Sequence, residues 1–136
     1  MTFAGMNYFA VVVAAIAAFL FGGLYYRVLG PYWIKAVGIT KKNLKTTSST
    51  PLIITIIAEL IMAWVLAGLI AHLGPGQITV RNGVESAAFV WLGFVITTLA
   101  VNNAFAMRKP MLNVIDGAHW LGVLLIIGAV IGAFGV

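Results

Sequence analysis

A chain of 136 residues has room for one domain, and here 62% of the residues are hydrophobic while only 8% are charged. The mean hydropathy of +1.10 lies far above that of soluble proteins, so we expect lipid as the solvent and exclude a separate soluble catalytic domain. The net charge is +5 and there is no cysteine. Disulfide, thiolate and cysteine-based metal chemistry are therefore excluded, and cations that lie between apolar segments do not indicate nucleic-acid binding.

Four apolar segments are each long enough to cross a bilayer core about 30 Å thick. They predict an all-α bundle of four transmembrane helices in a single membrane domain, with spans at about 8–26, 51–73, 86–107 and 111–134. No cationic segment precedes the first span, so we expect it to be retained rather than cleaved as a signal peptide.

Local signals predict where these spans begin and end. Thr50 and Pro51 have the order expected of a helix N-cap and the first helical position. The Gly-Pro-Gly sequence at 74–76 ends the second span, and Asn82-Gly83 predicts a turn before the third. Only residues 108–110 separate the third span from the fourth, so these two should form an antiparallel hairpin.

The distribution of lysine and arginine predicts the orientation in the membrane. Seven of the eight cations fall in the first and third loops, namely Arg27, Lys35, Lys41, Lys42, Lys45, Arg108 and Lys109. The positive-inside rule places these loops in the cytoplasm and both termini outside it. We therefore predict an N-out/C-out, multi-pass protein of the cytoplasmic (inner) membrane that contacts membrane lipids and no nucleic acid.

Aromatic residues near the ends of the spans predict contact with lipid headgroups. Tyr25, Tyr26, Tyr32 and Trp33 cluster after the first span, and Trp91 lies near the outer end of the third. We expect residues 31–38 to lie along the membrane interface.

Small residues recur at four-residue spacing on three spans, which lets helix backbones approach closely. They are Ala10, Ala14, Ala18, Gly22, Ala63, Ala67, Ala71, Gly128 and Gly132. Packing within one bundle is the favoured interpretation of any single row, and a subunit interface is the alternative. Because four short helices leave much surface facing outward, we expect a homo-oligomer overall.

Five polar side chains within the spans are the candidate site, because such residues are costly in lipid. Glu59, Asn102, Asn103, Asp116 and His119 all lie about 8–15 Å from the cytoplasmic end of their spans, at 1.5 Å per residue. Asn102 and Asp116 should face each other across the hairpin, and Asp116 and His119 share a helix face. We call these five side chains at a common depth the polar layer. The second, third and fourth spans would thus build this layer, and the first would supply an apolar wall.

Three roles fit this layer. It can hold the helices in register by hydrogen bonds, or relay a proton or ion through a carboxylic acid and an imidazole. A metal site formed by Glu59, Asp116 and His119 is the least favoured role, since these residues lack any local ligand spacing. We therefore expect no metal and no cofactor.

The sequence predicts a channel or transporter of an ion or small solute as the function. An accessory subunit of a larger membrane complex, or a lipid-binding membrane protein, is the alternative. Neither a nucleophile-base pair nor a phosphate-binding glycine loop is present. We therefore expect no enzymatic activity; a membrane enzyme would have to rely on Asp116 and His119.

Several sequence segments together resemble a known family. They are FLFGGLYY at 19–26, PYWIKAVGIT at 31–40, ELIMAWVLAGLI at 59–70, WLGFVITTLAVNNAF at 91–105 and IDGAHWL at 115–121. The chain resembles the bacterial four-helix membrane proteins known as domain of unknown function 1761. The resemblance covers nearly the whole chain and implies four spans and no particular reaction. Glu59 matches the family pattern, whereas Asp116 stands where family members tend to have asparagine.

Overall fold

The computed structural model describes residues 6–40 and 48–135. Four helical segments in these ranges are long and apolar enough to cross a membrane, and the same ranges contain no strand. The spans follow one another as α1 (Tyr8–Val37), α2 (Thr50–Ala71), a third span of three pieces, and α5 (Pro110–Phe134). The prediction of an all-α protein with four spans is confirmed.

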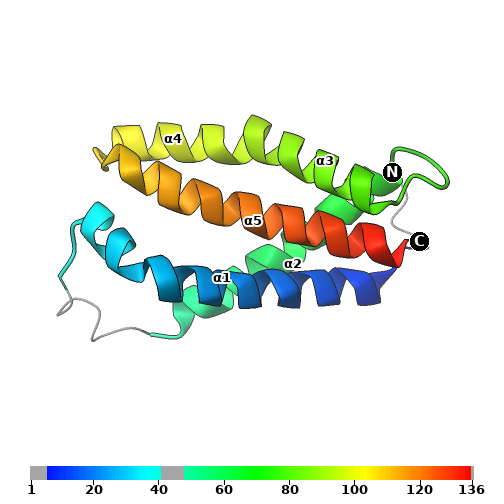
Figure 1. The fold of residues 1–136 in the computed structure, drawn as a ribbon, viewed down its shortest axis with the longest axis horizontal. Helices are drawn as coiled ribbons and strands as arrows, with labels where there is room; N and C mark the ends of the chain where they lie inside the picture. The colour runs from blue at the N-terminus through cyan, green and yellow to red at the C-terminus, as the bar shows by residue number, and fades with distance from the viewer. Residues whose placement is uncertain (1–5, 41–47, 136) are drawn as a thin grey trace.

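The third span is interrupted by a turn of π-helix. It consists of α3 (Val80–Val90), a π-turn (Trp91–Val95) and α4 (Ile96–Phe105). As Figure 1 shows, it lies alongside α5, and the two form the expected antiparallel hairpin. The start of α1 and the end of α5 lie together at one end of the bundle. We call the opposite end, which holds Lys35, Arg108 and Lys109, the basic end.

The first helix is longer than the span predicted within it. Its N-cap is Asn7, whose Oδ1 accepts a hydrogen bond of 3.1 Å from the Ala10 N–H. The helix passes residue 26 and Pro31 without a break and ends at Val37, before Gly38 with a φ of +82°. At 30 residues it is about 45 Å long and exceeds the bilayer core. That its last turns lie along the interface stays a prediction.

The third span begins earlier than the sequence indicated. Residues 82 and 83 lie inside α3, so the turn predicted there is wrong. Thr79 is the N-cap, and its side chain accepts a hydrogen bond of 3.2 Å from the Asn82 N–H. The start of α2 also differs by one residue: Ser49 is its N-cap, and the helix begins at Thr50 rather than Pro51. At the start of α3, capping by Thr79 and close packing of Gly83 on α5 outweigh turn propensity.

The fifth helix is the centre of the bundle, since it contacts α1, α2 and every part of the third span. Most of the small residues that recur at four-residue spacing are buried between the helices of the bundle. This supports the favoured interpretation that they pack within one bundle. They are Ala10, Ala14, Ala18, Gly22, Ala63, Ala67, Gly128 and Gly132. Large apolar side chains instead point outward along α1, α2 and α4, as expected for surfaces in contact with lipid.

The closest helix approach joins α3 to α5. A Cβ atom added at Gly128 would lie 2.2 Å from the Gly83 carbonyl oxygen, and one added at Gly83 would lie 2.0 Å from the Gly128 carbonyl oxygen. Nearer the end of α5, Gly132 meets the Thr79 carbonyl in the same way. Backbones therefore touch directly along this crossing, which only glycine permits.

Two cations of the turn between α4 and α5 cover the end of α1. Arg108 Nη1 lies 3.4 Å from the Val37 carbonyl oxygen, and Lys109 Nζ lies 3.3 Å from that of Lys35. Cations near unpaired carbonyls at a helix C-terminus stabilise it by about 0.3–1 kcal/mol each. Three further cations of the predicted basic loop, Lys41, Lys42 and Lys45, lie outside the described residues. The N-out/C-out orientation itself stays a prediction.

We predict that Gly128→Ala destabilises the bundle by about 1–3 kcal/mol, because the added methyl group must push α3 and α5 apart. Thermal unfolding of the protein in a mild detergent measures the effect. Gly23→Ala is the matched control, since a Cβ at Gly23 meets nothing within 4 Å. Equal unfolding temperatures for the two variants would contradict the tight crossing.

Candidate functional site

Two tyrosines of α1 hold the start of α5 in place. The Tyr25 hydroxyl donates a hydrogen bond of 2.6 Å to the Ile115 carbonyl oxygen, and the Tyr26 hydroxyl donates one of 2.5 Å to Asp116 Oδ1. The first span was expected to supply only an apolar wall at this depth, and that expectation is wrong. Adjacent tyrosines reach α5 here because residues 25 and 26 both lie on the inner side of α1.

On the other side, the third span holds the next residue of α5. The Trp91 indole Nε1 donates a hydrogen bond of 2.8 Å to the Gly117 carbonyl oxygen. Trp91 is the first residue of the π-turn, and its indole N–H bonds to a neighbouring helix; that this side chain lies in a headgroup belt stays a prediction. Gly117 admits the third span closely, since a Cβ there would lie 2.6 Å from Ile96 Cδ1. Residues 115–117 thus receive side-chain hydrogen bonds from helices on both sides.

One turn further along α5, His119 is buried among aromatic rings. Its ring is stacked on Phe21 with 6° between the planes, and its centroid lies 4.8 Å from that of Tyr26 and 4.7 Å from that of Trp120. Gly22 makes room for it, because a Cβ at that position would lie 2.9 Å from His119 Nε2. His119 Nδ1 has no hydrogen-bond partner among the residues the structure describes.

Glu59 is the most deeply buried acidic residue among the described ones. Its side chain, on α2, is 0% exposed, and neither of its carboxyl oxygens has a hydrogen-bond partner within residues 6–40 and 48–135. Buried polar groups normally have a partner, and one without it is costly. The orphaned carboxyl therefore requires an explanation beyond helix packing.

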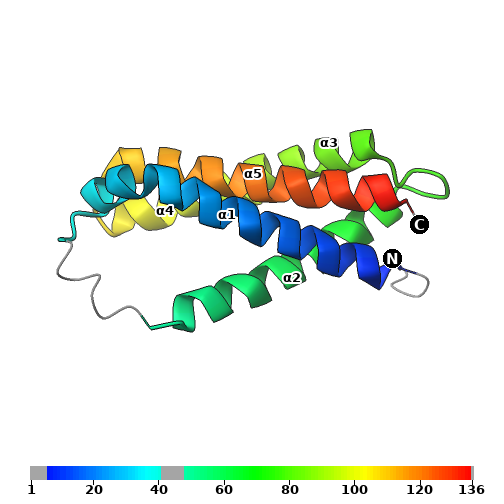
Figure 2. The same ribbon diagram turned by 60° about the horizontal axis from the view of Figure 1, so that its bottom comes forward.

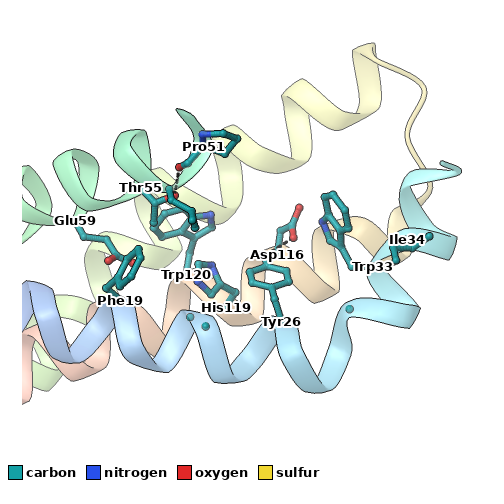
Figure 3. Close-up of a pocket in the computed structure, with 14 residues that line it drawn as sticks. Phe19, Tyr26, Trp33, Ile34, Pro51, Thr55, Glu59, Asp116, His119 and Trp120 are labelled. Atoms are coloured by element: carbon teal, nitrogen blue, oxygen red, sulfur yellow. Dashed lines mark hydrogen bonds between the residues drawn. The ribbon is translucent and has the colours of Figure 1, made fainter. Parts of the chain in front are cut away.

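Glu59, Asp116 and His119 line one cavity of about 540 Å³ between α1, α2 and α5. Figure 3 shows their side chains entering it from α2 and α5, with Phe19, Tyr26 and Trp33 of α1 along its wall. Two separate apolar clusters lie beyond it, a large one toward the chain termini and a small one around Ala36, at the basic end. The cavity thus interrupts the apolar core of the bundle.

The two asparagines of the predicted layer lie elsewhere. Asn102 is exposed on α4, and Asn103 donates a hydrogen bond of 2.6 Å to Asn113 Oδ1 of α5. Neither lines the cavity, so the expected pair of Asn102 and Asp116 is not formed. The layer predicted from the second, third and fourth spans instead comes from α1, α2 and α5. The hairpin itself was predicted, but its register differs from the predicted one, since Asn103 pairs with Asn113 and Gly117 meets Ile96. Depth along the spans also does not fix the rotation of α4.

The arrangement allows some roles and disfavours others. Asp116 accepts a hydrogen bond from Tyr26 and lies beside the Trp33 indole. These contacts favour a structural role for Asp116. No group of three His, Cys, Asp or Glu side chains in the described ranges is placed to hold a metal ion. Glu59 and His119 remain as cavity-lining residues with buried polar atoms that have no hydrogen-bond partner among the described residues. A binding or relay role therefore fits better than a metal site.

Comparison with known proteins identifies one family. The family model described as "Protein of unknown function (DUF1761)" matches residues 9–132. No curated protein and no solved structure matches the chain.

We predict that Tyr26→Phe destabilises the protein by about 1 kcal/mol, because it removes the hydroxyl that Asp116 accepts from. Combining it with Asp116→Ala, which removes the acceptor, in a double-mutant cycle measured by unfolding in detergent should reveal coupling between the two positions. Tyr32→Phe is the control, since Tyr32 is 64% exposed. Additive effects of the Tyr26 and Asp116 substitutions would refute the bond.

Proposed function

This chain belongs to the DUF1761 family, whose description states no activity, and we propose that it is a channel or transporter for an ion or small solute. The cavity between α1, α2 and α5 is the binding site in this proposal. Glu59 binds the proton or other cation, His119 relays or balances charge, and Asp116 positions the wall through Tyr26. The proposal includes a homo-oligomer in the cytoplasmic membrane, with the basic end inside the cell and no enzymatic step.

The observation that carries the proposal is the buried Glu59 carboxyl with both oxygens unpartnered beside a cavity. Intramembrane carboxyl groups are costly and commonly mark ion or substrate pathways. A structural role would be supported by a hydrogen bond to a neighbouring helix, as Asp116 has with Tyr26. Because Glu59 has none among the described residues, the ligand-binding role is favoured over structural support.

The cavity extends toward the basic end of the bundle. Figure 2 shows α2 crossing the other helices at an angle, so that its Thr50 end diverges from α1. The cavity lies between these diverging parts and extends from Glu59 to residues 51 and 33. Small residues line the α1 side, namely Gly22, Gly23 and Gly30. A solute would therefore enter from the basic end.

The alternative is an accessory subunit or lipid-binding protein, and one observation favours it. The third span is the least buried of the four, and Gly93, Thr97 and Asn102 are exposed on it. Thr97 Oγ1 donates to the Gly93 carbonyl oxygen of its own helix at 3.0 Å. Such a face suits a neighbouring helix, either from a second copy or from a foreign subunit. Native mass spectrometry from nanodiscs distinguishes the two, and a stoichiometric foreign subunit would favour the alternative.

We predict that a thiol placed at Thr55 reacts with a charged, membrane-impermeant methanethiosulfonate reagent. Thr55 lines the cavity, whereas the adjacent Ile54 is 61% exposed on the lipid side of α2. Because only a hydrated thiolate reacts readily, Thr55→Cys should be labelled roughly ten-fold faster or more than Ile54→Cys. The chain has no cysteine of its own, so each variant reports on one site. Equal, slow labelling of both would mean that the cavity is dry.

We predict that the protein carries a proton current that depends on Glu59. Proteoliposomes loaded with pyranine and driven by a potassium gradient with valinomycin should change internal pH faster than empty liposomes. Glu59→Gln should bring the rate to background, because the amide keeps the shape but cannot exchange a proton. Glu85→Gln is the matched control, since Glu85 is exposed and bonded to Arg81 at 2.8 Å. A Glu59→Gln rate equal to wild type would remove Glu59 from the mechanism.

A further inference from the structure

The cavity beside Glu59 has walls rich in aromatic rings. Phe19, Tyr26 and Trp33 of α1 and Trp120 of α5 line it together with small and aliphatic residues. Figure 3 shows the Glu59 side chain reaching from α2 toward Phe19. Aromatic faces attract cations, and Trp and Tyr do so most strongly when water is excluded. These walls therefore offer a cation both apolar contact and electrostatic attraction.

Two acidic side chains line the cavity. Its ionisable lining residues are Glu59, Asp116, His119 and Tyr26, and no lysine or arginine of the described ranges is among them. Two cations of the basic end, Arg108 and Lys109, lie against carbonyl oxygens at the end of α1. Since the Asp116 carboxyl is already bonded to Tyr26, Glu59 is the acidic group left to pair with a ligand.

The size of the cavity distinguishes an organic ligand from a bare ion. A volume of about 540 Å³ falls within the range of about 300–1,000 Å³ typical of sites for small organic molecules. Small inorganic cations need several oxygen ligands at close range, whereas the lining here is mainly apolar. An occupant of matching chemistry has an apolar body and a single positive charge.

We infer that this cavity binds an apolar organic monocation, with Glu59 as its counter-ion and the rings of Phe19, Tyr26, Trp33 and Trp120 around its body. The inference rests on the proposed function, because it names the class of solute for the same site. A quaternary ammonium or phosphonium group with aromatic or aliphatic substituents has the required chemistry. Neutral molecules of the same shape lack the partner for Glu59, and anions are repelled by it.

The test uses tetraphenylphosphonium and tetraphenylborate, which have nearly the same shape and opposite charge. Binding of each to the full chain in nanodiscs is measured by equilibrium dialysis, with empty nanodiscs subtracted. We expect saturable binding of tetraphenylphosphonium and none of tetraphenylborate. Glu59→Gln should weaken the binding of tetraphenylphosphonium on the order of ten-fold or more. Glu85→Gln should leave its binding unchanged.

A second variant covers the case in which Glu59→Gln fails to fold. Phe19→Leu keeps the cavity wall apolar but removes an aromatic ring. It should therefore weaken the binding of tetraphenylphosphonium several-fold, on the scale of one cation–π contact. Phe89→Leu is its control, since Phe89 is 76% exposed on α3. Equal binding of both ions would indicate an apolar site for lipid chains and would overturn the inference, as would no saturable binding of the cation.

These results separate the inference from the proposed function. If the cation does not bind but the proton current still depends on Glu59, the inference is wrong and the proposed function stands. Cation binding without any current and without labelling at Thr55 would instead support the site and refute transport.

Discussion

Direct backbone contact between α3 and α5 is the constraint on which the rest of the bundle depends. Glycines at 83 and 128 bring the two helices together, and this places the π-turn against the middle of α5. Trp91 then reaches the Gly117 carbonyl, while the tyrosines of α1 hold residues 115 and 116 from the other side. Since lipid provides little hydrophobic force between helices, such close contacts and hydrogen bonds must supply the specificity. With α5 fixed on two sides, α2 is left as the helix that can diverge and open a cavity.

The cavity is the result of unequal packing along α2. In the half near the chain termini, Ala63, Leu66 and Ala67 pack into the main apolar cluster. Toward Thr50, the same helix contributes Thr55 and Glu59 to the cavity lining and turns large aliphatic side chains outward. Packing in one half therefore fixes α2 firmly enough to hold a buried carboxyl in the other half. Functional sites often combine rigid support with a locally unfavourable polar group, and Glu59 has this combination.

Much of the fold followed from hydropathy and residue spacing, because a bilayer leaves few choices to an apolar chain. Four spans, the hairpin and the inward rows of small residues were all predictable. Boundaries were less so: the sequence Asn82-Gly83 is typical of a turn, yet it lies within α3 because Gly83 meets Gly128. For the candidate site, depth along the spans correctly grouped Glu59, Asp116 and His119. Depth says nothing about rotation, so it also included Asn102 and missed Tyr26. The signal that could have found the tyrosines is their position one turn after Gly22, on the same face as the row of small residues.

The π-turn at Trp91–Val95 has a consequence for how this chain tolerates change in length. A turn of π-helix holds one residue more than a turn of α-helix and is commonly found as a single bulge. Deleting one residue there would restore a regular helix without a break, but α4 would rotate by about 100° relative to α3. The bond from Trp91 to Gly117 and the bond from Asn103 to Asn113 then could not both form. The extra residue thus sets the relative phase of two halves of one span, so that each half presents its own bonding side chain to the same neighbour.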